Sequence, residues 1–227
     1  MGKGIRPGSL FAFEGIDGSG KSTQCKFLLG RLKKEGFQTA FFDFPQYRKK
    51  SAGPVEEYLK GTYGSSLDVG AYRASIFFAA DRYDASFRIS RMLEQGKVVI
   101  TDRYAGSNIG HQGGKFPGRK ERKKFFYWLF SLEYGIFQIP KPAVSLFLKI
   151  PPLVAKELCE NEERRKKKAR DIHEKDIRHL VDAEASYLDA IKMFPGDFRV
   201  VECVENGTLL SAEEIHEKVW REVKQFL

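Results

Sequence analysis

Residues 15–22 read Gly-Ile-Asp-Gly-Ser-Gly-Lys-Ser and fit the pattern G-x-x-x-x-G-K-S/T in full. They follow a short apolar run, residues 9–14, which predicts a buried strand, and they open a helical stretch over residues 21–35. Glycines allow a backbone that turns successive N–H groups inward, and the helix N-terminus adds partial positive charge. In this context a chance match in a glycine-rich turn is the weaker interpretation. The motif predicts a site for the phosphates of a nucleoside triphosphate, formed by Gly15, Asp17, Gly18, Ser19, Gly20, Lys21, Ser22 and Thr23.

Outward from this loop, predicted strands and helices alternate along the chain. Short apolar segments indicate strands, and longer segments with an apolar stripe indicate helices between them. This alternation implies parallel strands joined by right-handed crossovers. We therefore expect a doubly wound, three-layer α/β/α fold with a five-stranded parallel sheet, in a single domain over residues 1–227. The predicted strands are 9–14, 39–44, 98–101, 144–150 and 199–203, and the predicted helices include 21–35, 55–59, 71–95 and one that starts at Ser211.

A second candidate site follows the predicted strand at 98–101, where Asp102 and Arg103 come directly after the apolar run. The carboxyl end of a central strand lies beside the phosphate-binding loop in such sheets, so Asp102 can hold Mg²⁺ or its water shell together with the Ser22 hydroxyl. The alternative is an aspartate that merely caps the next helix. A guanidinium at Arg103 can bridge two phosphates, which favours a kinase of a small phosphorylated acceptor over a GTPase.

Composition and charge exclude several classes of protein. The chain has 227 residues with 42% apolar and 30% charged residues, which suits an ordered globular domain rather than a disordered or fibrous one. No apolar run approaches the ~20 residues of a membrane-spanning helix, and no secretory signal is evident. Three cysteines without metal-ligand spacing favour a cytoplasmic location. The net charge of +9 fits an enzyme of phosphorylated substrates, and nucleic acid is the alternative partner.

The ordered set of short motifs resembles the thymidylate kinase family of P-loop nucleoside monophosphate kinases. The resemblance runs from about Ser9 to Leu188 and implies transfer of the γ-phosphoryl group of ATP to dTMP, giving ADP and dTDP. Mg²⁺ is the implied cofactor, and a homodimer is the implied assembly, with no nucleic acid or membrane partner. The motifs are residues 14–24, Phe44-Pro45, residues 78–82, residues 102–104, Ser107-Asn108, residues 140–142 and residues 170–174.

The resemblance also implies roles for residues of the acceptor site. Phe78 matches the aromatic residue on which thymine stacks, and Arg82, one helical turn later, matches the donor to its O4. For Phe78 alone, ordinary core packing is the alternative. The other implied acceptor residues are Asp17 at the 3′-hydroxyl, Phe44 lining the site, Arg103 at the phosphate, Ser107, Asn108 and Gln112 at the base edge, and Glu174 near the acceptor and metal.

The basic run within residues 159–172 lies where the family has its lid. A closing segment that carries arginine can exclude water and bring positive charge to the transferring phosphoryl group. The phosphate-binding loop itself has Gly18 and Ser19 where some family members place an arginine, so Arg165 and Arg170 are the expected lid arginines. The alternative is a solvated basic helix face. With Lys21, Asp17 and Arg103, these two arginines complete the predicted catalytic set.

Two departures from the family pattern concern the acceptor. Gln46 stands where an arginine commonly holds the acceptor phosphate, so Arg48 is the predicted substitute. His111 and His173 stand at positions that are usually aromatic, and His173 is expected to contact the acceptor. A kinase of another nucleoside monophosphate, such as dUMP, is therefore the alternative function. A nucleic-acid-stimulated P-loop ATPase is a more distant one.

Two further expectations concern residues outside the motifs. Aromatic residues occupy all sides of a helix that ends near Ile139, which predicts burial in the core or against a partner. His179 and His216 carry no predicted role and are expected at the surface.

Overall fold

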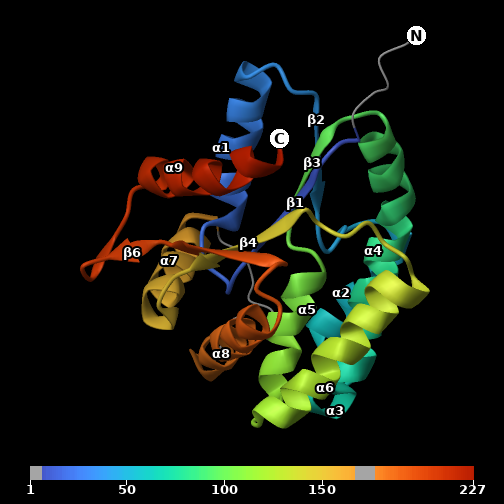
Figure 1. Cartoon of the computed structure of the whole chain (residues 1–227). Coiled ribbons are helices and arrows are strands. Elements are labelled where there is room, and N and C mark those ends of the chain that lie inside the picture. The colour runs from blue at the N-terminus through green and yellow to red at the C-terminus, as the bar shows by residue number, and fades with distance from the viewer. Residues whose placement is uncertain (1–6, 167–176) are drawn as a thin grey trace.

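The computed structural model describes residues 7–166 and 177–227, and the side chains of residues 162–166 lie outside this description. Five parallel strands form the central sheet in the order β2-β3-β1-β4-β5 (Figure 1). This arrangement confirms the predicted fold class. The strands are β1 (Leu10–Glu14), β2 (Thr39–Asp43), β3 (Val98–Asp102), β4 (Val144–Lys149) and β5 (Phe198–Glu202).

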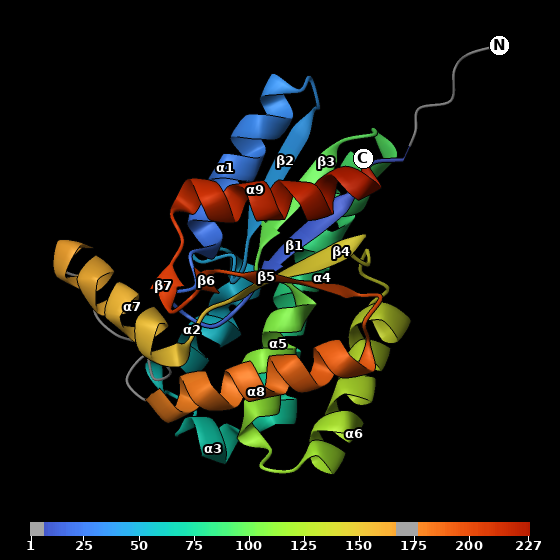
Figure 2. The ribbon, with the colours of Figure 1, turned by 60° about the vertical axis from the view of Figure 1, so that its left-hand side comes forward.

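Helices cover both faces of the sheet (Figures 1 and 2). Helices α1 (Lys21–Lys34) and α9 (Ala212–Val223) cross each other on one face, and α4 (Ala71–Glu94) and α5 (Ala105–His111) pack on the other. Helices α6 (Arg119–Phe130) and α8 (Ile177–Met193) pack against α5. The other α-helices of the described residues are α2 (Gly53–Lys60), α3 (Ser66–Val69) and α7 (Pro152–Lys166), and β6 (Val204–Glu205) and β7 (Thr208–Leu209) form a small hairpin.

Strand β1 shows why the sheet is buried on both faces. Phe11 and Phe13 point into the core shared with α1 and α9, whereas Leu10 and Ala12 point into the core shared with α4 and α5. Successive side chains of a strand point to opposite faces of the sheet, and apolar residues on both faces are typical of a central parallel strand. Burial of Phe11 and Phe13 on one face and of Leu10 on the other contributes about 1.5–3 kcal/mol for each side chain, so β1 anchors both layers.

The aromatic-rich helix is only partly buried. Phe125 and Phe126 are fully buried, but Tyr127 is 55% exposed and Ile136 is 70% exposed. The expectation of burial in the core is therefore wrong for Tyr127 and Ile136, and burial against a partner stays a prediction. The α-helix ends at Phe130, and residues Ser131–Ile136 continue as a π-helix. The wider turn changes the face that each following residue presents.

The sheet brings the two predicted phosphate sites together. β1 and β3 are neighbours, with Phe13 opposite Asp102, so the loop after β1 and the loop after β3 leave the sheet side by side. This is the carboxyl edge, where open α/β sheets bind ligands. Within the described part of the chain, no helix is both long and apolar enough to cross a membrane.

Candidate active site

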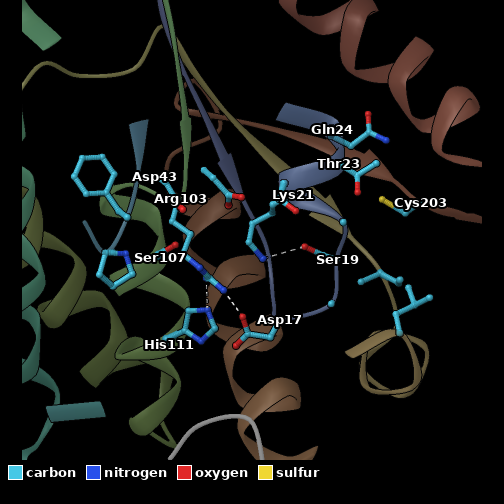
Figure 3. Close-up of a pocket in the computed structure, with 18 of the residues that line it drawn as sticks. Asp17, Ser19, Lys21, Thr23, Gln24, Asp43, Arg103, Ser107, His111 and Cys203 are labelled. Carbon is cyan, nitrogen blue, oxygen red and sulfur yellow. Dashed lines mark hydrogen bonds and ion pairs between the residues drawn. The ribbon is translucent and has the colours of Figure 1, made fainter. Parts of the chain in front are cut away.

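A pocket of about 770 Å³ lies at the carboxyl edge of the sheet. The loop after β1 and the start of α1 line one end of it, and residues of α4 and α5 line the other. Figure 3 shows the loop residues Asp17, Ser19 and Lys21 facing Arg103 and His111 across this space. A pocket of this size holds a ligand as large as a nucleotide.

The phosphate-binding loop has the backbone that its glycines were expected to permit. Gly15, Gly18 and Gly20 have φ values of 147°, 82° and 83°. Gly18 also faces α7 closely, because a Cβ there would lie 2.1 Å from the carbonyl oxygen of Ala155. Gly20, in contrast, has open space around it. The loop therefore needs Gly18 for both its conformation and its contact with α7.

Lys21 folds back over the loop. Its Nζ donates to the carbonyl oxygens of Gly15 at 3.1 Å and Ile16 at 2.8 Å. The residue is 7% exposed, and burial lowers the pKa of its ammonium group to about 8, with the charge of Arg103 acting in the same direction. Lys21 is thus held at the phosphate end of the pocket by groups that a phosphate oxygen can replace.

Asp17 and Arg103 form an ion pair across the pocket (Figure 3). Arg103 has a φ of 66°, in the left-handed region that residues other than glycine rarely adopt. Its Nη1 also lies 3.0 Å from Nε2 of His111. Burial opposes ionisation of Asp17, but Arg103 overrides this and lowers the pKa of the carboxyl well below its usual range. The structure thus pairs two of the predicted catalytic residues with each other.

Arg82 is held by a residue that sequence reasoning missed. Its Nε lies 3.1 Å from one carboxylate oxygen of Glu133, and its Nη2 bonds to the same carboxylate. The side chains are 2% and 0% exposed, so this is a buried, bidentate ion pair. Glu133 lies in the π-helix that follows α6. In the sequence, the signal that could have indicated this pair was a lone acidic residue within an aromatic-rich helix.

Phe78 and Phe44 line the same pocket, as predicted for the acceptor site. Phe78 is half-buried on α4, with its ring edge-on to Tyr58 at 6.0 Å. Phe44 is 4% exposed and packs edge-on against Tyr104 at 5.8 Å. Both rings are therefore fixed by aromatic neighbours before any ligand arrives.

The predicted base-edge residues Ser107, Asn108 and Gln112 also line the pocket. The Ser107 hydroxyl donates to Glu14 at 2.6 Å, and the Asn108 amide donates to the carbonyl of Ser75 at 3.2 Å. Gln112 is 1% exposed, and its Oε1 has no hydrogen-bond partner among the described residues. An N–H group placed against this buried oxygen would satisfy it.

Glu14 is a second residue that sequence reasoning missed. It is fully buried beneath α5 and accepts from the backbone N–H of Tyr104 at 2.9 Å, from Ser107 and from the Tyr187 hydroxyl at 3.2 Å. Burial raises the pKa of this carboxyl. Glu14 fixes the start of α5 against the end of β1, and thereby the position of Ser107.

The residues around Gln46 do not reproduce a phosphate site. Gln46 is 6% exposed, and its backbone N–H and side-chain amide bond to Asp81 at 2.7 and 3.1 Å. Arg48 is exposed, and it is not among the residues that line the pocket. Tyr47, which the sequence analysis passed over, does line the pocket.

The remaining predicted residues divide between the pocket and the part of the chain that is not described. Ser22 and Asp102, the predicted metal ligands, line the pocket. The predicted lid begins within α7, which ends at Lys166. Arg170, His173 and Glu174 lie outside the described residues, as does the side chain of Arg165.

The two histidines without a predicted role differ in burial. His216 is 8% exposed and packs edge-on against Phe27 at 5.7 Å, so the expectation that it lies at the surface is wrong. His179 is half-buried and stacks on His111 with ring centroids 5.2 Å apart.

A phosphate-binding loop paired with Arg103, and a buried Arg82 in the same pocket, define a P-loop kinase that acts on a small acceptor. The comparisons identify the family. The thymidylate kinase family profile matches residues 13–218, so the chain belongs to the thymidylate kinase family. Family, fold and enzyme class are thereby confirmed: the chain is a nucleoside monophosphate kinase, and the reaction of its family is the ATP-dependent phosphorylation of dTMP.

Individual relatives agree with this membership. The thymidylate kinase of Mycobacterium tuberculosis is 31% identical over 169 residues, which cover 74% of this chain and 78% of that protein. The thymidylate kinase of Schizosaccharomyces pombe is 29% identical over 65% of this chain and 64% of its own length. A solved structure of the Candida albicans enzyme shares the fold, with a TM-score of 0.73 and 24% identity over 97% of this chain and 92% of that one.

Proposed function

We propose that this chain phosphorylates dTMP by binding ATP at the phosphate-binding loop and the acceptor between α4 and α5. One observation carries the assignment of the base. Arg82 is fixed as a cation by Glu133, and Gln112 offers an unpartnered acceptor oxygen in the same pocket. Thymine presents a carbonyl oxygen at C4 and an N–H at N3, which match a donor and an acceptor. Cytosine presents the reverse pattern, so the pair favours dTMP and dUMP over dCMP.

At the donor end, the loop glycines and Lys21 are proposed to bind the β- and γ-phosphates. Lys21 exchanges its bonds to Gly15 and Ile16 for bonds to phosphate oxygens. Ser22 and Asp102 supply a hydroxyl and a carboxylate within the same pocket, a donor set that fits Mg²⁺ bound largely through substrate phosphates and water. Mg²⁺ would supply charge neutralisation at the phosphates. Glu174 is retained as a further proposed ligand.

At the acceptor end, Arg103 is proposed to bind the acceptor phosphate and the transferring phosphoryl group. It lies between the phosphate-binding loop and α5, and its contacts to Asp17 and His111 leave further N–H donors on the guanidinium. The acceptor phosphate is already anionic at neutral pH, because its second pKa is about 6, so the chain needs no general base. Alignment and charge stabilisation are the contributions of the protein.

The other assignments remain part of this proposal. Asp17 holds the 3′-hydroxyl of the acceptor through its free lone pairs, Phe78 stacks on the base, and Arg165, Arg170 and His173 act from the lid. Arg48 contributes to acceptor phosphate binding only if its exposed segment moves toward the pocket. Tyr47, which lines the pocket, is the better placed residue.

The experiment is coupled ADP release with MgATP against dTMP, dUMP, dCMP and thymidine. We expect dTMP and dUMP to be phosphorylated and dCMP to react at least 100-fold more slowly, as kcat/KM. Gln112→Leu removes the acceptor oxygen and raises KM for dTMP, whereas Gln112→Glu keeps it and serves as the matched control. Equal use of dCMP would contradict the proposed base recognition. ATP turnover that appears only with nucleic acid would favour the ATPase alternative.

We also propose that the chain is a homodimer through α4. Tyr72, Ile76, Tyr83 and Phe87 lie on one face of this helix and are 40–61% exposed. Their spacing of 4, 7 and 4 residues forms a single apolar stripe along the helix. Light scattering after size exclusion tests this, and Phe87→Glu with Tyr83→Glu should give a monomer.

A cytoplasmic location is proposed as well, supported by three cysteines without disulfides.

A further inference from the structure

Two histidines link the candidate catalytic arginine to α8. His111 is the last residue of α5, and His179 lies in the first turn of α8. The rings stack with centroids 5.2 Å apart and an interplanar angle of 22°, and Nδ1 of His111 lies 3.0 Å from Nε2 of His179. On its other side, Nε2 of His111 lies 3.0 Å from Nη1 of Arg103 (Figure 3). The three side chains form one hydrogen-bonded row.

The direction of every hydrogen bond in this row follows from Arg103. A guanidinium nitrogen only donates, so Nε2 of His111 accepts and carries no proton. The proton of His111 is therefore on Nδ1, which donates to His179. Nε2 of His179 accepts that bond, so its proton is on Nδ1 as well. Both rings are neutral in this arrangement, and each has one defined tautomer.

The row does more than join two helices. Helices α5 and α8 are already fastened by the Ser186 hydroxyl, which donates to the carbonyl of Ile109 at 2.6 Å. Gly110 packs so closely on Tyr187 that a Cβ there would lie 2.1 Å from the ring. Arg103, in contrast, is bound to Asp17 through Nη2 alone, and His111 supplies the second anchor, at Nη1. Two anchors fix the plane of the guanidinium, whereas one leaves it free to rotate.

We propose that His111, backed by His179, is a positioning residue that holds Arg103 for the acceptor phosphate while the imidazole is neutral and releases it on protonation. This inference rests on the proposed function, in which Arg103 binds that phosphate. An imidazolium has no acceptor for Nη1, and it places a second positive charge beside the guanidinium. Histidine is the side chain whose ordinary pKa lies between pH 5 and 8, so the release is sought in that range.

The charged and titratable groups that face the row, among the described residues, come from the phosphate-binding loop and from α1, β1, β3 and α8. Asp17 of the loop pairs with Arg103, and Lys21 at the start of α1 acts on the charge of Asp17. Arg103 follows β3, and the carboxyl groups of Asp102 in β3 and Glu14 in β1 act on its charge. Tyr187 of α8 lies edge-on to His111 at 6.4 Å and donates to Glu14 of β1, and burial raises the pKa of this tyrosine well above its usual value. Tyr187 therefore adds no charge to the row.

The kinetic test compares two substitutions of one residue. His111→Phe keeps a ring but removes the acceptor, so we expect KM for dTMP to rise about tenfold at pH 7.5, with KM for ATP within twofold of wild type. His111→Gln can accept from Arg103 and donate to His179, so it should stay within about threefold. Below pH 6.5 the wild-type KM should rise more steeply than that of His111→Gln, because only the wild type has an imidazole to protonate at this position. The titration of dTMP itself, with a second pKa of about 6, affects both proteins equally. A KM for His111→Phe within twofold of wild type would overturn the inference.

A spectroscopic test is independent of the reaction. Long-range ¹H–¹⁵N spectra of the imidazoles at pH 7.5 should show His111 and His179 protonated at Nδ1, and Arg103→Met should let His111 take its proton at Nε2. Protonation of His111 at Nε2 in the wild-type chain, or no change in Arg103→Met, would overturn the inference even in an active enzyme. Absence of transfer to dTMP by the wild type, with the expected tautomers present, would instead count against the proposed function alone.

Discussion

Arg82 and Arg103 both face the pocket and both pair with a carboxylate, but the molecule holds them in opposite ways. Arg82 and Glu133 are 2% and 0% exposed, and the contact is bidentate. Arg103 and Asp17 are 21% and 23% exposed, and each contact uses a single guanidinium nitrogen. Arg82 is built into the core as a fixed charge at the base end. Arg103 is held at the phosphate end by contacts that an anion can replace.

The largest expected effect concerns Arg103, the partly exposed arginine of this comparison. Arg103→Ala should lower kcat for dTMP by about 10³-fold, since arginines that neutralise a transferring phosphoryl group contribute at least that much. Its free energy of unfolding should change by less than about 1 kcal/mol, because a partly exposed pair contributes little. Coupled ADP release and urea unfolding measure the two quantities. Arg119→Ala, at an exposed surface arginine, is the control, and an equal loss of activity in both variants would count against the role.

Loss of the Arg82–Glu133 pair should lower the free energy of unfolding more than loss of the Arg103–Asp17 pair. Glu133→Gln leaves Arg82 charged, buried and without its carboxylate, so the free energy of unfolding should fall by about 3–5 kcal/mol. The double variant Arg82→Met with Glu133→Leu removes both charges and should recover most of that loss. Urea unfolding of the three proteins is the measurement. A loss below about 1 kcal/mol in Glu133→Gln would show that Arg82 is not a fixed charge, and the contrast with Arg103 would disappear.

The smallest expected effect is the pH dependence of stability that the Asp17–Arg103 pair produces. The pKa of Asp17 is lowered in the folded chain, chiefly by Arg103 working against burial, so its pairing contributes stability above the unfolded pKa near 3.9. That contribution is lost as pH falls below about 4 toward the folded pKa. Asp17→Asn should therefore cost less than about 1 kcal/mol at pH 7 and show a shallower acid loss than wild type. Parallel unfolding curves from pH 7 to 3 would contradict this.

The parts of the site that lie close together in the sequence were predictable. The phosphate-binding loop is a local motif between a strand and a helix, and Asp102 and Arg103 follow directly from a short apolar strand. The topology then brings both loops to one edge of the sheet. Local pattern and the handedness of parallel crossovers are sufficient for this much.

The partners of these residues were not predictable. Glu133 meets Arg82 from 51 positions away, and it does so from the π-helix that follows α6. His179 meets His111 from 68 positions away. Such pairs depend on how two helices pack against each other, and a single sequence does not show which helices do so. The burial of Gln46 against Asp81 has the same origin, 35 positions apart.

The pKa of Lys21 should depend on whether a nucleotide occupies the donor end of the pocket. Its ammonium is bonded to two carbonyl oxygens of the loop and has a pKa of about 8. An arriving polyphosphate raises that pKa again, because an anion favours the charged form. Near pH 8, nucleotide binding should therefore draw a fraction of a proton from solution, and the heat of binding in a calorimeter should vary with the ionisation enthalpy of the buffer. The full charge of the loop is thus completed by its ligand rather than supplied in advance by the fold.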